Sequence, residues 1–349
     1  MDDRRVSRAE LLRFAVAAFS ATGMSPSDAA TVADVLVWAN ERGIDSHGVM
    51  RIPIYLKEIK TGEYRPKGEP VTRQLLPGIF QLDCNRAPGP VCMMRAAAHA
   101  IELAEACGVG VGVLSDPTHL GAMGHYAQWV AARGYAALVI VAGLPFMAYH
   151  GAKVASIGTS PIAIGIPAQG PDTAPLLLDM ATSITSSGRI RQAAAEGKTL
   201  PEGAAIDAAG KLTIDPREAA SLLSIGGAKG SGLSLMFECL TGILAGTPIL
   251  APTARADRAL TPRQNAMIIV LNVKAFRSLA DYGHDVRLLA EKVKALPRRD
   301  GFDEVLLPGE RGDREAELRR STGIPLPAWL WTDFAGLAQE MGIPPLRPS

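Results

Sequence analysis

The chain has 349 residues, more than one hydrophobic core usually holds, so its length favours two closely packed domains. Apolar residues make up 48% of the sequence and charged residues 20%, which is typical of globular α/β proteins and excludes a disordered chain. Lys and Arg number 36 against 35 Asp and Glu, so no excess charge is available to attract nucleic acid or an anionic membrane.

The N-terminal segment and the cysteines favour a cytoplasmic protein. Met1–Ser7 leads directly into an amphipathic pattern and lacks the apolar core and cleavage site of a signal peptide. No apolar run is long enough to span a membrane, because the richest, residues 135–145, has the length of a strand. The four cysteines form no Cys-x-x-Cys pair and predict buried thiols in a reducing compartment; they are Cys84, Cys92, Cys107 and Cys239.

Helical patterns open the chain. Ser7 and Glu10 form a capping box, which predicts a helix over residues 7–23. A second helix is predicted over residues 25–43, and a short or bent third helix over residues 52–59.

The rest of the chain alternates between strand and helix patterns, which predicts an α/β fold. Strands or extended segments are predicted at 71–82, 109–114, 136–141, 162–166, 176–178 and 267–273, and helices at 90–106, 123–133, 186–196, 233–244, 281–296 and 313–320. The helix at 281–296 is expected to be the last long helix of the core. Residues 200–216 are expected to form a long irregular excursion, and the Pro-rich tail at 344–349 is expected to fray.

Ser46-His47-Gly48 and Arg51 form a first candidate for the active site. On a helical turn, residues four apart lie on one face, so His47 and Arg51 would both face a bound carboxylate. Arg can form two parallel hydrogen bonds to a carboxylate, and His can exchange a proton near neutral pH. Ser46 would cap the turn. Spacing alone favours the alternative, a capped surface turn with an exposed His and Arg.

His119 is a second candidate, because it follows a predicted strand and precedes a helix. Gly121 and Gly124 behind it allow close approach of the backbone to a ligand. A loop histidine that bonds to the backbone is an equally good interpretation.

The glycine-rich segment Gly226–Gly232 would cradle a phosphate, with Lys229 as a point charge. It is not a Walker P-loop, because Gly230 separates Lys229 from Ser231. The glycines at 108–112 alternate inside a strand pattern, so no Rossmann fingerprint is present. The histidines show no familiar ligand spacing, and we predict no metal site.

A series of motifs follows in one order along nearly the whole chain. They are Asp45-Ser46-His47-Gly48 with Arg51, Pro53 and Tyr55, then His119-Leu120-Gly121-Ala122, Gly158–Ala163, Asp179–Ser183, Pro201-Glu202-Gly203, Gly226-Gly227 with Lys229-Gly230, and Pro308-Gly309-Glu310. This series resembles the malate/L-lactate dehydrogenase family of the non-Rossmann type, to which ureidoglycolate, sulfolactate and 2,3-diketogulonate enzymes also belong.

The resemblance implies the architecture of the molecule. A mainly helical domain would be built from both chain ends, residues 1–75 and 275–349. A non-Rossmann nucleotide-binding α/β domain with a mixed sheet would cover residues 76–274. The resemblance also implies a homodimer.

The resemblance further implies roles for particular residues. His47, ranked first, or His119 would transfer the proton, Arg51 would hold the substrate carboxylate, and Ser46 would belong to the same catalytic group. Contacts to NAD or NADP would come from Asp179, Met180, Ala181, Thr182, Ser183, Ala228, Lys229, Pro308, Gly309 and Glu310. Ser160, where the family usually has Asn, and Tyr149-His150 depart from the family pattern near the substrate pocket or a local loop.

The function implied is hydride transfer between NAD(P) and a small 2-hydroxy or 2-oxo acid. One alternative is reduction of a cyclic imine such as pyrroline- or piperideine-2-carboxylate. A second alternative is a catalytically inactive protein that binds a nucleotide or an acid. The expected partner is the small-molecule substrate, with neither nucleic acid nor a membrane.

Overall fold

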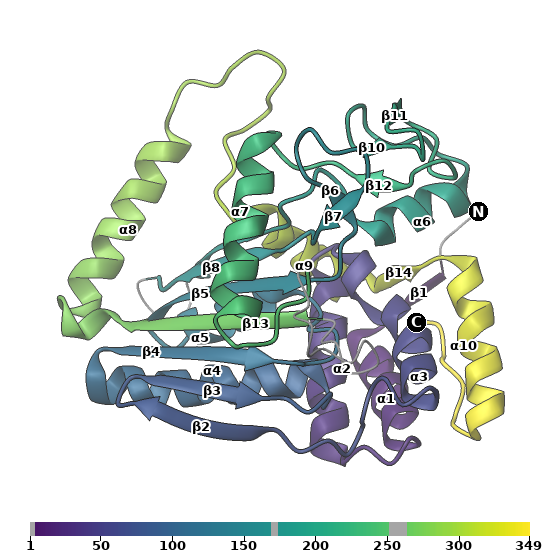
Figure 1. The fold of residues 1–349 in the computed structure, drawn as a ribbon, viewed down its shortest axis with the longest axis horizontal. Coiled ribbons are helices and arrows are strands. Elements are labelled where there is room, and N and C mark those ends of the chain that lie inside the picture. Colours follow the sequence, from purple (N-terminus) through teal and green to yellow (C-terminus); the bar gives the residue numbers. More distant parts are fainter. Residues whose placement is uncertain (1–3, 169–173, 251–263) are drawn as a thin grey trace.

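The computed structural model describes residues 4–168, 174–250 and 264–349 (Figure 1). Met1–Asp3, the start of the N-terminal segment discussed above, lie outside the described residues. Within the described ranges, no helix is both long enough and apolar enough to cross a bilayer.

The predicted helices and strands are present, with additional short strands and a C-terminal helix. The helices are α1 (Arg8–Ser20), α2 (Pro26–Glu41), α3 (Ile52–Lys60), α4 (Gly89–Cys107), α5 (Met123–Ala131), α6 (Ser187–Glu196), α7 (Ala228–Glu238), α8 (Leu279–Lys294), α9 (Glu310–Thr322) and α10 (Ala328–Met341). The strands are β1 (Arg4–Val6), β2 (Val71–Leu76), β3 (Ile79–Asp83), β4 (Val109–Ser115), β5 (Tyr135–Gly143), β6 (Met147–Ala148), β7 (Ala155–Ile157), β8 (Ile162–Ile166), β9 (Leu176–Met180), β10 (Ala205–Ile206), β11 (Leu212–Thr213), β12 (Ser221–Leu222), β13 (Gln264–Asn272) and β14 (Ile324–Leu326).

The central sheet has seven strands in the order β2-β3-β4-β13-β5-β8-β9. β3 and β4 run parallel, and every other neighbouring pair is antiparallel, so the predicted mixed sheet is confirmed. β13 lies between β4 and β5, although it comes more than a hundred residues later in the chain. The two strands of the predicted strand-helix-strand unit are therefore separated by a late strand.

Helices cover both faces of this sheet (Figure 1). α4 and α5 pack on one face, and α7 packs on the other. Two alternating glycines of β4 make room for close neighbours. A Cβ at Gly110 would collide with Ala100 of α4, so this glycine lets the helix approach the sheet, and a Cβ at Gly112 would collide with the ring of Phe80 on the neighbouring strand β3. The glycine pattern at 108–112 thus serves packing inside a strand.

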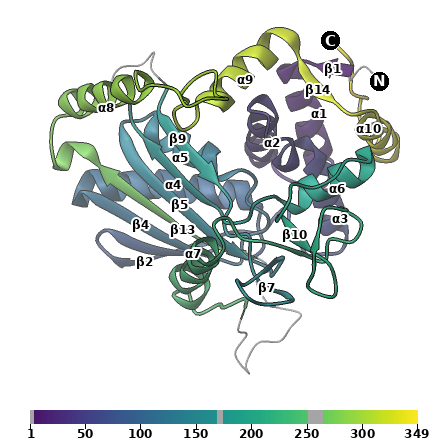
Figure 2. The same ribbon diagram turned by 90° about the horizontal axis from the view of Figure 1, so that it is seen from above.

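A second hydrophobic core joins the two ends of the chain. It is formed by α1, α2, α3 and α10 together with the two-stranded pair β1 and β14. Phe14 of α1 and Phe334 of α10 are both fully buried, and their ring centroids lie 4.8 Å apart. Figure 2 shows both termini beside β1, β14 and α10. The boundaries of the two predicted domains stay predictions.

Two expectations about the C-terminal part were wrong. α8 does not belong to the core, because only Gly283 along its length is buried. The tail is not frayed: Leu346 is buried, and the Ser349 N–H donates to the Arg5 carbonyl at 2.9 Å. The tail is ordered because it packs against β1 and α1, and no sequence pattern predicts this contact.

The thiols and the glycine-rich segment also differ from expectation. Cys84 and Cys92 are buried, whereas Cys107, the last residue of α4, and Cys239, on the helical turn that continues α7, are exposed. α7 begins at Ala228 and not at 233, so the later glycines of the segment lie inside the helix. Residues 200–216 are less irregular than predicted, since they contain β10 and β11 of a small five-stranded sheet.

The Phe14–Phe334 contact predicts that α10 is essential to stability. Phe334→Ala should lower the free energy of unfolding by about 3–5 kcal/mol, because it opens a cavity at a fully buried ring. Urea denaturation followed by circular dichroism measures the loss. Trp329→Ala, on the same helix but 39% exposed, is the matched control and should cost far less. Equal losses from both variants would contradict the assigned core.

Candidate active site

Ser46, His47 and Arg51 lie on two successive 3₁₀ turns, Asp45–His47 and Val49–Arg51, which lead into α3. Gly48 joins the turns, and a Cβ there would collide with the Asn40 side chain. The expected cap by Ser46 was wrong: neither turn has a side-chain cap. Instead, the Ser46 hydroxyl lies 3.0 Å from Nδ1 of His47.

Residues outside the motif hold this turn in place. The Asn40 amide oxygen accepts a 2.7 Å hydrogen bond from the Val49 N–H, and its nitrogen donates to Asp45 at 2.6 Å. Arg319 of α9 donates to the Asn40 carbonyl at 2.6 Å and to the Asp45 carboxylate at 2.8 Å. Sequence reasoning missed Asn40 and Arg319, since their partners lie on other elements.

His119 lies beside His47, although 72 positions separate them in the chain. The two imidazole rings stack, with centroids 5.6 Å apart and planes at 25°. The Gly121 N–H donates to Nδ1 of His119 at 3.2 Å, and the Tyr55 hydroxyl lies 2.6 Å from the same atom. A backbone N–H can only donate, so Nδ1 of His119 is unprotonated and the ring carries its proton on Nε2.

Both histidines are uncharged at neutral pH. Burial, followed by the charges of Arg51 and Arg189, lowers the pKa of His47 to about 3. Burial lowers the pKa of His119 well below its ordinary value, with further contributions from Arg51, His47 and Arg191. His47 and Arg51 are both half-buried, so the alternative of an exposed surface His and Arg is wrong.

These residues line one cavity of about 830 Å³. Of the predicted site residues, Ser46, His47, Arg51, His119, Asp179, Met180, Ala181 and Ser183 contribute to its wall. Ser160 lines it as well, and its hydroxyl accepts a 2.9 Å hydrogen bond from Ser234. The segments predicted to hold substrate and nicotinamide thus meet at one place.

Thr182 is predicted to contact the cofactor, but its side chain lies behind the wall. It is fully buried, and its hydroxyl donates to the Thr159 carbonyl at 2.9 Å. Gly230 packs against it: a Cβ at Gly230 would be 2.7 Å from the Thr182 carbonyl oxygen. The start of α7, with Ala228 and the exposed Lys229, therefore lies next to the Asp179–Ser183 segment, although neither residue lines the cavity.

Pro308, Gly309 and Glu310 also lie outside the cavity wall but beside it. The Pro308 carbonyl accepts a 3.2 Å hydrogen bond from Leu177 of β9, and Arg311 lines the cavity. Glu310 accepts from the Leu307 N–H at 3.0 Å, and this bond, with Lys294 and Arg314, lowers its pKa to about 2.

Other residues of the cavity wall were not singled out from the sequence. Arg189 and Arg191 come from α6, and Asp116 to Thr118 come from the loop after β4. A lone Arg on a helix carries no distinguishing signal, so only the folded chain identifies these residues. His150, one of the departures from the family pattern, donates its backbone N–H to Ser231 at 2.9 Å and does not line the cavity.

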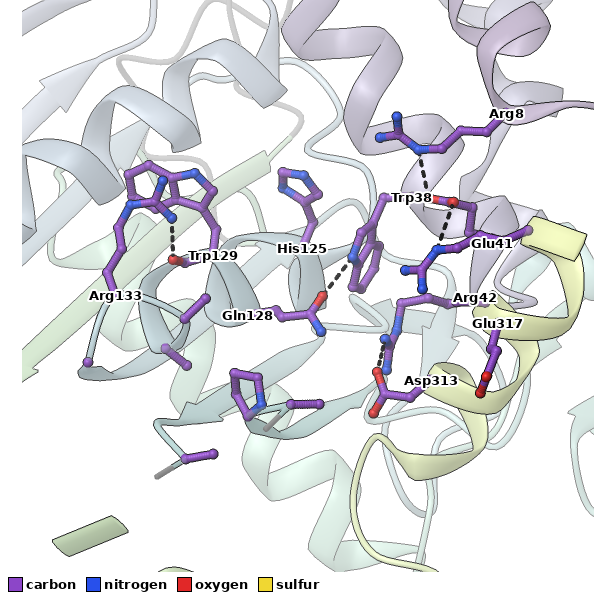
Figure 3. Close-up of a pocket in the computed structure, with 18 of the residues that line it drawn as sticks. Arg8, Trp38, Glu41, Arg42, His125, Gln128, Trp129, Arg133, Asp313 and Glu317 are labelled. Atoms are coloured by element: carbon purple, nitrogen blue, oxygen red, sulfur yellow. Dashed lines mark hydrogen bonds and ion pairs between the residues drawn. The ribbon is translucent and has the colours of Figure 1, made fainter. Parts of the chain in front are cut away.

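A second cavity, of about 1300 Å³, lies between α2, α5 and α9 (Figure 3). Its charged side chains are engaged with one another: Arg42 pairs with Asp313, and Arg8 bonds to Glu41 at 3.1 Å. Arg133 stacks on Trp129 with its guanidinium 3.6 Å from the ring centroid. This cavity brings together none of the predicted catalytic or cofactor residues.

The described part of the chain contains no group of three or more His, Cys, Asp and Glu side chains that is placed to hold a metal ion.

Comparison with known proteins gives consistent matches. The sequence profile of the malate/L-lactate dehydrogenase family matches residues 6–335. Malate dehydrogenase of Pyrococcus abyssi is 30% identical over 355 residues, which cover 97% of this chain and 95% of the relative. The crystal structure of malate dehydrogenase from Entamoeba histolytica superposes with a TM-score of 0.91 at 26% identity, over 98% of this chain and 99% of that one.

The same fold occurs in an imine reductase. The structure of Δ1-piperideine-2-carboxylate reductase from Pseudomonas syringae superposes with a TM-score of 0.81 at 29% identity, over 97% of this chain and 99% of that one. The profile match spans nearly the whole chain and the relatives align from end to end, so the predicted family and fold class are confirmed. The chain belongs to the malate/L-lactate dehydrogenase family and is an oxidoreductase.

Proposed function

We propose that this chain transfers a hydride between NAD or NADP and C2 of a small 2-hydroxy or 2-oxo acid. The observation that carries the proposal is the meeting of His47, His119 and Arg51 in one cavity with the Asp179–Ser183 segment. Two uncharged imidazoles and a guanidinium suit an acid whose neighbouring hydroxyl gains or loses a proton.

The residues around this cavity fit a nicotinamide dinucleotide. Gly230 allows α7 to approach the Thr182 carbonyl so closely that a Cβ would fill the space between them. The start of α7 offers a helix N-terminus and the exposed Lys229, which suit a pyrophosphate. The nicotinamide would be held by Asp179, Met180 and their neighbours, and the opposite end of the cofactor would be contacted by Pro308–Glu310. The bound nicotinamide would supply or accept the hydride.

Three side chains of the cavity would bind the substrate and move the proton. Arg51 would hold the substrate carboxylate, with its Nε fixed on the Ser46 carbonyl at 2.9 Å. Nδ1 of His119 already accepts the Gly121 N–H, so this ring would offer its Nε2–H as a donor to the substrate oxygen. The partner of His47 is the Ser46 hydroxyl, which can either donate or accept a hydrogen bond. His47 can therefore gain or lose a proton and keep its hydrogen bond to Ser46. This difference supports His47 as the proton-transfer residue.

A second candidate activity is reduction of a cyclic imine that carries a carboxylate. The similarity to piperideine-2-carboxylate reductase supports it, since the hydride geometry and the carboxylate grip would be the same. The product distinguishes the two activities, because an imine yields an amine and a 2-oxo acid yields a hydroxyl group.

The test is a screen of 2-oxo acids and cyclic imines with NADH and with NADPH, in which the fall in absorbance of the reduced nicotinamide reports turnover. His47→Ala is then measured with the substrate and cofactor that give the highest activity. We expect kcat/KM to fall by about 10²–10⁴ in His47→Ala, since general acid-base catalysis is lost, with cofactor affinity nearly unchanged. His284→Ala, an exposed histidine on α8, is the control and should behave as wild type. Unchanged turnover in His47→Ala would remove His47 from the mechanism, and a blank screen would favour a binding protein without catalysis.

Asp179 gives a prediction about pH and stability. Burial raises its pKa to about 6, against the hydrogen bond from the Gly124 N–H and the charge of Arg42. Its pKa is thus above the unfolded value of about 3.9, so the carboxyl leaves the free energy of unfolding unchanged below about pH 4. Its destabilising effect grows between about pH 4 and pH 6 and is constant at higher pH. Asp179→Asn, whose amide oxygen can still accept from the Gly124 N–H, should gain stability over wild type between pH 4 and pH 6, levelling off at about 3 kcal/mol.

Urea unfolding at several pH values measures this gain. The exposed Asp300→Asn should show no such trend. A gain for Asp179→Asn that is constant with pH would contradict the buried, ionisable state of Asp179.

We further propose that the chain forms a homodimer through α7. This helix and the turn after it expose a stripe of apolar side chains at helical spacing, with Met236 53%, Leu240 46% and Ile243 54% exposed. Such a stripe on a charged surface is typical of a protein interface.

Light scattering should give twice the mass of one chain. The Met236→Lys/Leu240→Lys double variant should give the mass of one chain, whereas Leu212→Lys, exposed elsewhere, should stay dimeric. A dimeric double variant would exclude this face.

A further inference from the structure

The backbone of the loop that carries His119 is held by bonds to other elements. The Leu120 N–H donates to the Gln264 side chain of β13 at 3.1 Å, and the Tyr126 hydroxyl of α5 donates to the Leu120 carbonyl. The position of the loop is thus fixed without any contribution from the His119 side chain. What remains to be set is the rotation of the imidazole ring.

Tyr55 of α3 reaches this ring. It is fully buried in the core that joins the two chain ends, with its ring centroid 6.3 Å from that of Phe19 and 5.6 Å from that of Tyr64. Its hydroxyl lies 2.6 Å from Nδ1 of His119. Tyr55 does not line the 830 Å³ cavity, so it contacts the imidazole and not the contents of the cavity.

The direction of this bond follows from the Gly121 N–H, which can only donate and lies 3.2 Å from the same nitrogen. Nδ1 accepts from Gly121, so the Tyr55 hydroxyl must also be a donor. Burial raises the pKa of Tyr55 above its ordinary value, against the charge of Arg51, so the phenol keeps the proton that it donates. The bond from Tyr55 is the shorter of the two, whereas the bond from Gly121 is at the long end of the usual range.

Tyr55 also follows Arg51 by four positions, at the point where the second 3₁₀ turn continues into α3. Residues four apart are neighbours on a helix, and the charge of Arg51 does act on Tyr55. One short segment therefore carries the guanidinium that would hold the substrate carboxylate and the hydroxyl that holds the His119 ring.

We propose, building on the function proposed above, that Tyr55 is a positioning residue whose hydroxyl fixes the His119 imidazole with its Nε2–H directed at the oxygen on C2 of the substrate. Without this bond, Nδ1 keeps only the longer bond from Gly121, and the ring presents its Nε2–H in the productive direction for less of the time. Binding of the acid depends on Arg51 and is not affected. Loss of the Tyr55 hydroxyl therefore lowers kcat and leaves KM.

The test is Tyr55→Phe, which removes one hydroxyl and keeps the buried ring. With the substrate and cofactor that give the highest activity, kcat should fall about ten- to a hundredfold, and KM for the acid should change by less than about twofold. Tyr64→Phe is the matched control, because Tyr64 is equally buried beside Tyr55 and its hydroxyl forms no hydrogen bond to His119 in the part of the chain that the structure describes. It should keep the wild-type kcat. Equal losses in both variants would overturn the proposal, since they would indicate a general effect on the core.

Nitrogen NMR of the protein without cofactor, with the NMR-active isotope in its histidine rings, reports on the bond directly. The Nδ1 signal of His119 is identified by its loss in His119→Gln. In the wild-type protein it should have the chemical shift of an unprotonated nitrogen that accepts a strong hydrogen bond. In Tyr55→Phe it should move toward the value of a free imidazole nitrogen, and in Tyr64→Phe it should stay.

This measurement separates the role of Tyr55 from the proposed activity. If no acid or imine is turned over but the signal moves only in Tyr55→Phe, the action of Tyr55 on His119 stands and the activity fails. If turnover is found but Tyr55→Phe keeps both the wild-type kcat and the wild-type signal, the activity stands and the role of Tyr55 fails. A fall in kcat with an unchanged signal would also overturn the proposal, because Tyr55 would then act by a route other than His119.

Discussion

The contact between Arg319, Asn40 and Asp45 is the interaction on which the candidate active site depends. Arg319 comes from α9 and Asn40 from the end of α2, so the chain ends must come together before the Ser46–Arg51 turn has its shape. Asn40 is 2% exposed and Arg319 8% exposed, and in such surroundings a guanidinium needs its carboxylate. The helical core thus has a direct purpose, because it fixes the turn that presents His47 and Arg51 to the cavity.

The second constraint is the absence of charge on the two histidines. An imidazolium at position 47 or 119 would lie in partly desolvated surroundings beside Arg51, and two positive charges so close together are unfavourable. The acid substrate proposed above would change this balance, since its carboxylate would neutralise Arg51 and allow His47 to hold a proton. His47 would be uncharged in the empty site and able to carry a proton once an acid is bound, as the hydride transfer proposed above would require.

Much of the architecture follows from local sequence, and the site follows from it only in part. The capping box at Ser7 and the apolar runs predicted most helices and strands, because these signals lie within a few residues. The grouping of His47 with His119 came from the family resemblance, since nothing in their spacing places them together. Arg189 was missed because its place in the cavity wall depends on the start of α6, where Gly188 lies against Ser46 from another part of the chain. Long-range packing of this kind produces no periodic pattern in the sequence.

The position of β13 has a consequence for how the molecule is made. The strand that occupies the middle of the central sheet is formed by Gln264–Asn272, whereas its neighbours β4 and β5 leave the ribosome more than a hundred residues earlier. Until β13 arrives, two apolar strands present open edges to solvent and to other nascent chains. Closing a sheet through such distant partners is slow. The growing chain therefore passes through a period in which protection by chaperones matters most, and it ends when the last third of the sequence is synthesised.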